Sequence, residues 1–179
     1  MKITLYLLIV FFSSDVLSFT KAKVKTSHSV ATASPKEIVT AHLRAIENGD
    51  WEKANSFLSE KFNMKMKGMP FFVSIQKKDA LNMHKARKMA FPDFKFNEKI
   101  EWEKGNQVKI AAFITGTHTG LLDYPAITKV PKTAATGLKI DLPSEYFIYT
   151  IENGQIVDIY GEIPDGHGPT ALKKQLNIK

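Results

Sequence analysis

The chain has 179 residues, of which 44% are hydrophobic and 11% aromatic, enough to build one core and therefore one domain. Its net charge is +7, but the lysines are spread along the chain, so we expect a basic solvated surface and no nucleic-acid partner, which would need a denser patch with interleaved aromatic residues. The absence of cysteine excludes disulfides and a lipid-modified cysteine.

The N-terminus has the pattern of an export signal. Lys2 precedes an apolar run over residues 3–12, and the polar residues that follow end in Val16-Leu17-Ser18, which resembles a cleavage site. The run is shorter than the roughly 20 residues of a membrane span, so an uncleaved anchor is the weaker alternative. We therefore predict a signal peptide over residues 1–18, a disordered tail over 19–33 and one domain over 34–179, in a protein that is secreted or periplasmic with no stable membrane span.

Helices dominate the first half of this domain. Ser34-Pro35-Lys36-Glu37 offers an N-cap, a proline at the first helical position and a capping-box glutamate, and Asn48-Gly49 ends the predicted helix. Asp50 can cap a second, short helix. An alternating pattern from Phe62 to Met66 predicts a strand with one wet face, and residues 76–90 predict a third helix that must end before Pro92.

Strands dominate the second half. Residues 94–102 alternate as a one-sided strand in which Glu98 falls on the apolar parity, as a core carboxylate or as a bulge or strand end. The run 108–120 predicts a strand buried on both faces at the centre of the fold, with Phe113 facing one covered side and a polar cluster at its end. About 20 irregular residues follow Gly120, and such a loop often borders a binding site.

The chain ends in a hairpin and a short helix. Two predicted strands, 145–151 and 155–163, are joined by a turn at Asn153-Gly154, and residues from Thr170 can form a helix that packs Leu172 and Leu176 on the sheet. Helices gathered early and strands gathered late favour an α+β fold, with the helices on one face of a curved antiparallel sheet.

Several short motifs occur in an order that resembles a known family. They are Ala90-Phe91-Pro92-Asp93-Phe94, Gly116-Thr117-His118-Thr119-Gly120, Thr136-Gly137, residues 152–160 (ENGQIVDIY) and Gln175-Leu176-Asn177. Over residues 34–178 the chain resembles the SnoaL-like polyketide cyclases, also called ester cyclases, of the nuclear-transport-factor-2-like superfamily. The resemblance implies a cone-shaped curved antiparallel sheet packed against three N-terminal helices.

The resemblance also implies a function. Family members bind a small hydrophobic, carbonyl-containing molecule in an apolar pocket without a metal or organic cofactor, and the best-known ones close a ring by aldol chemistry with an aspartate as general acid and base. A carboxylate in an apolar cone has a raised pKa, which suits it to accept protons from carbon acids. We expect a homodimer.

The family aspartate does not align directly with this chain. Tyr160 stands in place of a family tryptophan, Pro164 falls at the expected aspartate position and Asp165 follows it. Asp165 is therefore the candidate catalytic residue, and Glu162 is the alternative. Asp165 could instead be an ordinary aspartate in a turn before glycine, with no catalytic role. His118 lies in a matching motif and would assist catalysis, or its ring is satisfied by backbone.

The remaining candidates would bind substrate. They are Glu162, Tyr146, Tyr149, Glu98 and Trp102, and because Tyr146 and Tyr149 have opposite parity, only one of them can face the cavity. His84 is predicted to lie on the surface. Three hypotheses remain open at this point: a cofactor-independent cyclase, a non-catalytic ligand-binding or dimerisation domain, and an isomerase or dehydratase with Tyr146, Tyr149 or Glu98 as a second acid.

Overall fold

The computed structural model describes residues 33–68 and 73–179, except the side chains at 73 and 127. The predicted signal peptide and nearly all of the predicted tail lie outside the described residues. The helices are α1 Pro35–Asn48, α2 Trp51–Ser56, α3 Lys77–Ala90 and α4 Gly168–Gln175, with a 3-10 helix η1 at Ala126–Thr128. The strands are β1 Leu58–Lys67, β2 Val73–Gln76, β3 Lys99–Lys104, β4 Gln107–Ala112, β5 Thr115–Thr117, β6 Lys139–Asp141, β7 Glu145–Glu152 and β8 Gln155–Glu162.

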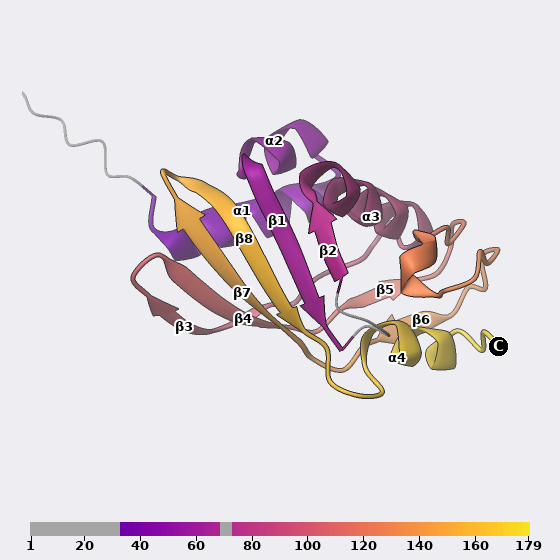
Figure 1. Ribbon diagram of the computed structural model, residues 1–179. Coiled ribbons are helices and arrows are strands. Elements are labelled where there is room, and N and C mark those ends of the chain that lie inside the picture. The colour runs from indigo at the N-terminus through magenta and orange to yellow at the C-terminus, as the bar shows by residue number, and fades with distance from the viewer. Residues whose placement is uncertain (1–32, 69–72) are drawn as a thin grey trace, which may run out of the picture. The chain divides into compact units, whose positions relative to one another are not determined.

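Six of the strands form one curved sheet in the order β2-β1-β8-β7-β4-β3, and β5 pairs with β6 separately (Figure 1). Every neighbouring pair is antiparallel except β1 and β8, which run parallel. The α1 helix packs on β4, β3 and β8, whereas α3 packs on β1 and β2. The predicted α+β fold, a curved sheet covered by three N-terminal helices, is therefore confirmed.

Local signals set the first helix as predicted. The Ser34 side chain accepts a hydrogen bond from the Glu37 N–H, the Glu37 carboxylate accepts one from the Ser34 N–H, and Gly49 ends the helix in the left-handed region at φ 73°. The buried stripe of α1 includes Val39, Leu43 and Ile46. This stripe fixes the helix against the sheet and closes one side of the interior.

The terminal hairpin is also confirmed. Asn153 and Gly154 both have positive φ angles, 50° and 77°, as a two-residue turn with right-handed strand twist requires. The turn sets the register in which Tyr149 pairs with Ile159. This hairpin of β7 and β8 provides the two central strands of the six-stranded sheet.

The prediction of one continuous, central strand over residues 108–120 was wrong. The structure divides it into β4 and β5, Phe113 between them is 40% exposed, and β4 lies next to the sheet edge. The break coincides with Asn97, whose φ is 45° and whose side-chain amide donates to the Phe113 carbonyl at 2.8 Å. Regular strand pairing also stops there, so β3 begins only at Lys99.

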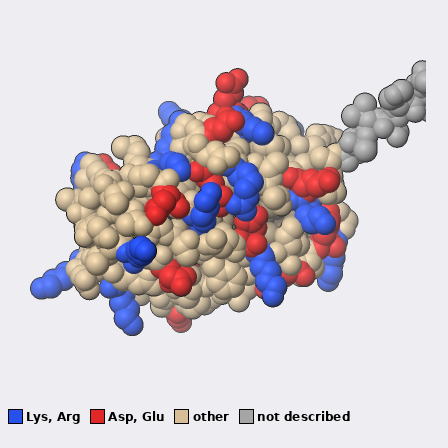
Figure 2. Space-filling view, turned by 180° about the vertical axis from the view of Figure 1, so that it is seen from behind, with Lys and Arg blue, Asp and Glu red and all other residues tan. Residues whose placement is uncertain are grey.

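Basic and acidic side chains are interspersed on the face seen in Figure 2, with no continuous patch of one sign. None of the helices in the described part of the chain has the length and apolar content that crossing a bilayer requires.

Candidate functional site

A cavity of about 80 Å³ lies between the sheet and the helices. Its apolar walls include Met64 and Met66 of β1, Phe147 of β7, Ile159 of β8, Met83 of α3 and Leu172 of α4. Polar groups enter this apolar space at only a few positions, which are Glu145, Arg87, His84, Tyr149, Tyr124 and Thr128 among the lining residues that the structure describes. Such a cavity, apolar with a few convergent polar groups, is the usual form of a small-molecule site.

Glu145 is the only carboxylate among these lining residues. It is the first residue of β7 and is 6% exposed. Among the described residues, no side chain forms a hydrogen bond or ion pair with its carboxylate. Burial raises the pKa of Glu145, although the nearby charges of Arg87 and His167 oppose that rise. A raised pKa makes the ionised carboxylate a stronger proton acceptor, which suits the group to acid–base chemistry.

The start of α4 lies directly against this carboxyl group. Gly168 has a φ of 53°, and a Cβ built there would lie 3.2 Å from Glu145 Oε1 and 2.8 Å from Ile163 Cγ2. The preceding residue, His167, places its Nδ1 2.8 Å from the Ser144 carbonyl oxygen. Because a carbonyl can only accept, Nδ1 carries the proton in this contact. Glycine at 168 is thus required for α4 to come this close to Glu145.

Arg87, in the last turn of α3, is the cation of the cavity. Its Nε donates to the Tyr124 hydroxyl at 3.1 Å, and its Nη1 lies 3.4 Å from His84 Nδ1. The guanidinium also lies over the Phe96 ring, 5.8 Å from the centroid. Burial works against the charged form, but the fields of Tyr124 and Glu145 outweigh it, and the pKa of Arg87 is raised. Arg87 therefore stays protonated.

Tyr149 and His84 complete the polar lining. Burial and the field of Glu98 raise the pKa of Tyr149, so its hydroxyl keeps its proton and is available as a donor. The pKa of His84 falls well below the usual value, chiefly through burial and then through Arg87. The neutral ring accepts from Arg87 at Nδ1 and therefore carries its own proton on Nε2. The prediction that His84 lies on the surface was wrong.

Of the tyrosines and the tryptophan named from the sequence, the structure places only Tyr149 in the cavity. Tyr146 faces the other side of the sheet, where Lys109 lies over its ring at 4.9 Å from the centroid. Trp102 pairs with Lys109 across β3 and β4 and is partly exposed. Successive side chains of β7 point to opposite faces of the sheet, so Tyr146 and Tyr149, which are three residues apart, lie on different faces.

The two acidic residues named near the end of β8 also lie away from the cavity lining. Glu162 is exposed and forms an ion pair with Lys67 at 3.0 Å. Asp165 is exposed in the turn before α4 and lines a surface depression that includes His167 and Lys173. This depression shares Thr128 and Pro169 with the cavity, so Asp165 lies on the outer side of the wall that Glu145 faces from within.

His118 is fully buried but lies behind the cavity wall rather than in it. Its ring is tilted against Phe91, a lining residue, with 5.1 Å between centroids. Its Nδ1 accepts from the Thr136 N–H at 3.3 Å and lies 3.0 Å from the Thr136 hydroxyl. Burial lowers its pKa. Within the described residues, His118 fastens the strand end to the long loop, and its Nε2 has no hydrogen-bond partner.

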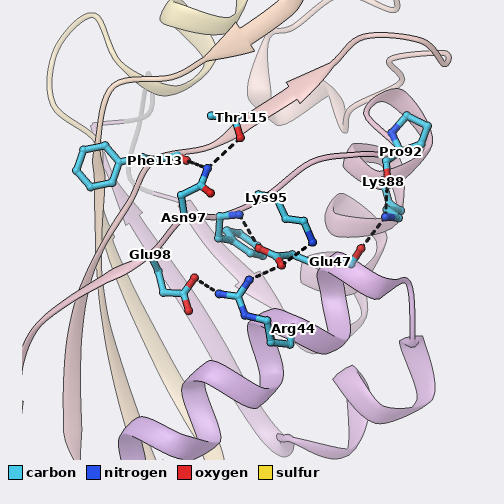
Figure 3. A network of polar contacts seen from close by, with 10 residues as sticks. Arg44, Glu47, Lys88, Pro92, Lys95, Asn97, Glu98, Phe113 and Thr115 are labelled. Atoms are coloured by element: carbon cyan, nitrogen blue, oxygen red, sulfur yellow. Dashed lines mark hydrogen bonds and ion pairs between the residues drawn. The ribbon is translucent and has the colours of Figure 1, made fainter.

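Glu98 belongs to an ion-pair network outside the cavity (Figure 3). Arg44 of α1 bridges Glu98 and the buried Glu47, and Glu47 also accepts from the Phe96 N–H at 2.7 Å and pairs with Lys95 at 3.3 Å. This network joins α1 to the irregular segment that carries Asn97. It holds Phe96, one wall of the cavity, in place.

Comparisons with known proteins agree with the fold. The model of the family described as SnoaL-like polyketide cyclase matches residues 36–165. IdmH from Streptomyces antibioticus, a proposed polyketide cyclase, is 17% identical over 81% of this chain and 99% of its own, with a TM-score of 0.60. A proposed polyketide cyclase from Acidithiobacillus ferrooxidans is 19% identical over 83% and 99%, with a TM-score of 0.59.

AclR from Streptomyces galilaeus, a proposed hydroxylase, is 14% identical over 80% of each chain, with a TM-score of 0.61. A comparison with curated proteins gave no match. At these identities the solved structures establish the fold alone, and it is the family match over most of the domain that establishes kinship. The chain belongs to the SnoaL-like polyketide cyclase family.

Proposed function

We propose that this protein binds a small hydrophobic carbonyl compound in the cavity and moves a proton to or from the carbon next to the carbonyl group, with Glu145 as acid and base. One observation carries the proposal: a buried carboxyl group with a raised pKa and no side-chain partner among the described residues faces an apolar cavity. Perturbed carboxyl groups in such clefts are typical of acid–base catalysts.

The proposed chemistry balances within the cavity. The Glu145 carboxylate takes a proton from the carbon, and the electron pair of that C–H bond forms an enolate whose oxygen accepts a hydrogen bond from the Tyr149 hydroxyl. In a ring closure, the enolate carbon bonds to a second carbonyl carbon of the same molecule. Glu145 then returns the proton to the resulting alkoxide oxygen. Apolar walls hold the flexible substrate folded for this step.

A second function, ligand binding without catalysis, is supported by one observation. Asp165, the nearest match to the family aspartate, is exposed outside the cavity. In that case the cavity binds a ligand without changing it, and Glu145 makes the cavity more polar but transfers no proton. The predicted export signal and homodimer stay predictions alongside both functions.

Deuterium exchange tests the proposal. Protein in D₂O is incubated with 2-pentanone and with 4-oxopentanoate, and exchange of the protons next to the carbonyl is followed by NMR. We expect wild type and Asp165→Asn to accelerate exchange equally, and Glu145→Gln to abolish the acceleration. Equal exchange with Glu145→Gln would contradict the role of Glu145. Bound ligand with no exchange would favour the second function.

A further inference from the structure

Arg87 is a cation in an apolar cavity without a matching anion. Its contacts are the Tyr124 hydroxyl, His84 Nδ1 and the face of the Phe96 ring. In the ranges 33–68 and 73–179, no carboxylate forms an ion pair with it. The neighbouring walls are Met83 and Phe91, which offer no charge. Arg87 is half-buried, and a charge partly removed from water is stabilised by an opposite charge, so this guanidinium is suited to receive an anion.

The carboxyl group of Glu145 does not fill that role. It lies close enough to influence Arg87 electrostatically, yet burial favours its neutral form. Among the described residues no ion pair or hydrogen bond joins Glu145 and Arg87, so the guanidinium donors that Tyr124 and His84 leave free remain open to an entering anion. A guanidinium presents its donors as a planar fork that matches the two oxygens of a carboxylate. An entering carboxylate would thus find both charge and geometry complementary to Arg87.

The cavity also limits the size of the ligand. Its volume of about 80 Å³ is close to half that of an engineered cavity of about 150 Å³ that holds benzene. A fused ring system is therefore too large, and a short or branched aliphatic chain fits where the flexible side chains of the lining adjust around it. Met64, Met66 and Met83 line it, and their unbranched thioether side chains pack readily around such a chain.

We propose that the cavity binds a short-chain oxo-carboxylate, with its carboxylate paired to Arg87 and its apolar part against the three methionines. In this arrangement the oxo group faces Tyr149 and the carbon next to it faces Glu145. The inference thus names a substrate class for the proposed function, and only the placement of the oxo group and that carbon rests on the proposed function. The carboxylate pairing itself requires no reaction, and binding alone can test it.

Calorimetric titration of the full protein with 3-methylbutanoate, its uncharged amide and 2-naphthoate tests the pairing and the size limit. We expect 3-methylbutanoate to bind, the amide to bind about tenfold more weakly or less, and 2-naphthoate not to bind. Arg87→Gln should weaken binding of the acid by about tenfold or more and leave the amide unchanged, since only the acid uses the charge. Lys85→Gln, which removes an exposed charge from the same helix, should change neither.

Two results would overturn the inference: equal binding of the acid and the amide, or stronger binding of 2-naphthoate than of 3-methylbutanoate. Should Arg87→Gln fold poorly by circular dichroism, Arg87→Lys supplies the test, because it keeps the charge but loses the fork and should bind the acid with intermediate affinity. Binding of 3-methylbutanoate through Arg87 without deuterium exchange in either ketone probe would support this inference and contradict catalysis by Glu145. The two proposals can therefore fail separately.

Discussion

Gly168 and Glu145 lie in contact at the point where α4 begins, with only 3.2 Å between Glu145 Oε1 and the place where a Cβ on residue 168 would lie. The positive φ of Gly168, 53°, adds a second constraint on this position. The α4 helix therefore begins in close packing against the Glu145 carboxyl group, at a residue that has no room for a side chain.

Gly168→Ala should lower the free energy of unfolding by about 1–3 kcal/mol, because alanine is strained at positive φ and its Cβ meets Ile163. Gly166→Ala is the matched control: its φ is 80°, but nothing lies within 4 Å of a Cβ there. Urea unfolding of both variants separates the contact from the backbone strain. Equal losses in the two variants would contradict a specific contact at 168.

Glu145 should make the protein less stable as the pH rises. Its folded pKa is raised, so the unfolded chain ionises first, from about the usual 4.5, while the folded protein still holds the proton. Stability therefore falls from pH 4.5 up to the folded pKa and then levels off. Arg87 and His167 face this group and moderate the effect. Glu145→Gln should remove the fall, which urea unfolding across pH would measure against wild type.

His42 should act in the opposite direction. It is buried on α1, its Nδ1 donates to the Ala54 carbonyl at 3.1 Å, and burial lowers its pKa to about 4. Its neutral form contributes stability that is fully present above the usual pKa of 6.5 and is lost as the pH falls toward 4. The loss amounts to about 3 kcal/mol. An NMR titration that shows His42 ionising near pH 6.5 would refute this.

Tyr149→Phe should slow deuterium exchange by about tenfold or more, since the enolate oxygen would lose a donor. The ring itself remains, so ligand affinity and folding should change little. Tyr146→Phe, on the opposite face of β7, is the control and should leave exchange unchanged. Exchange at the wild-type rate in Tyr149→Phe would mean that another group stabilises the enolate.

Glu47→Ala should destabilise the fold by about 1–3 kcal/mol, because it leaves the buried Phe96 N–H without its acceptor (Figure 3). Arg44 and Lys95 lose the same carboxylate but are 42% and 52% exposed, so water compensates most of that loss. Glu60→Ala is the comparison, since Glu60 forms its ion pair with Lys77 while 93% exposed and should change stability little. Thermal unfolding of the two variants gives the contrast. Similar melting temperatures would show that the network contributes little.

Sequence patterns predicted the parts of the fold that depend on local physics. The capping box at Ser34 and Glu37 and the Asn153-Gly154 turn act within a few residues, so the helix start and the hairpin followed directly from them. The break at Phe113 did not, because it depends on the Asn97 side chain, 16 residues earlier, binding the Phe113 carbonyl. Apolar periodicity cannot report such a tertiary contact.

The site was harder to predict, and two signals were present but unused. Glu145 shares the parity of Phe147 and Tyr149, which indicates a carboxylate on the buried face of its strand. Arg87 lies four residues after Met83, on the buried side of its helix. Asp165, Glu162 and His118 came from family motifs instead, and a motif fixes position along the chain but not which side of a wall a side chain faces.

Three methionines, Met64, Met66 and Met83, form part of the cavity wall and make its shape adaptable. Thioether chains change rotamer at little cost, so the lining can reshape around ligands that differ by a methyl group without moving the backbone. Oxidation by peroxide would remove this adaptability to different ligands, because a methionine sulfoxide places a strong dipole in the apolar wall of the cavity. Oxidation of these side chains should therefore weaken the binding of an apolar ligand in the cavity.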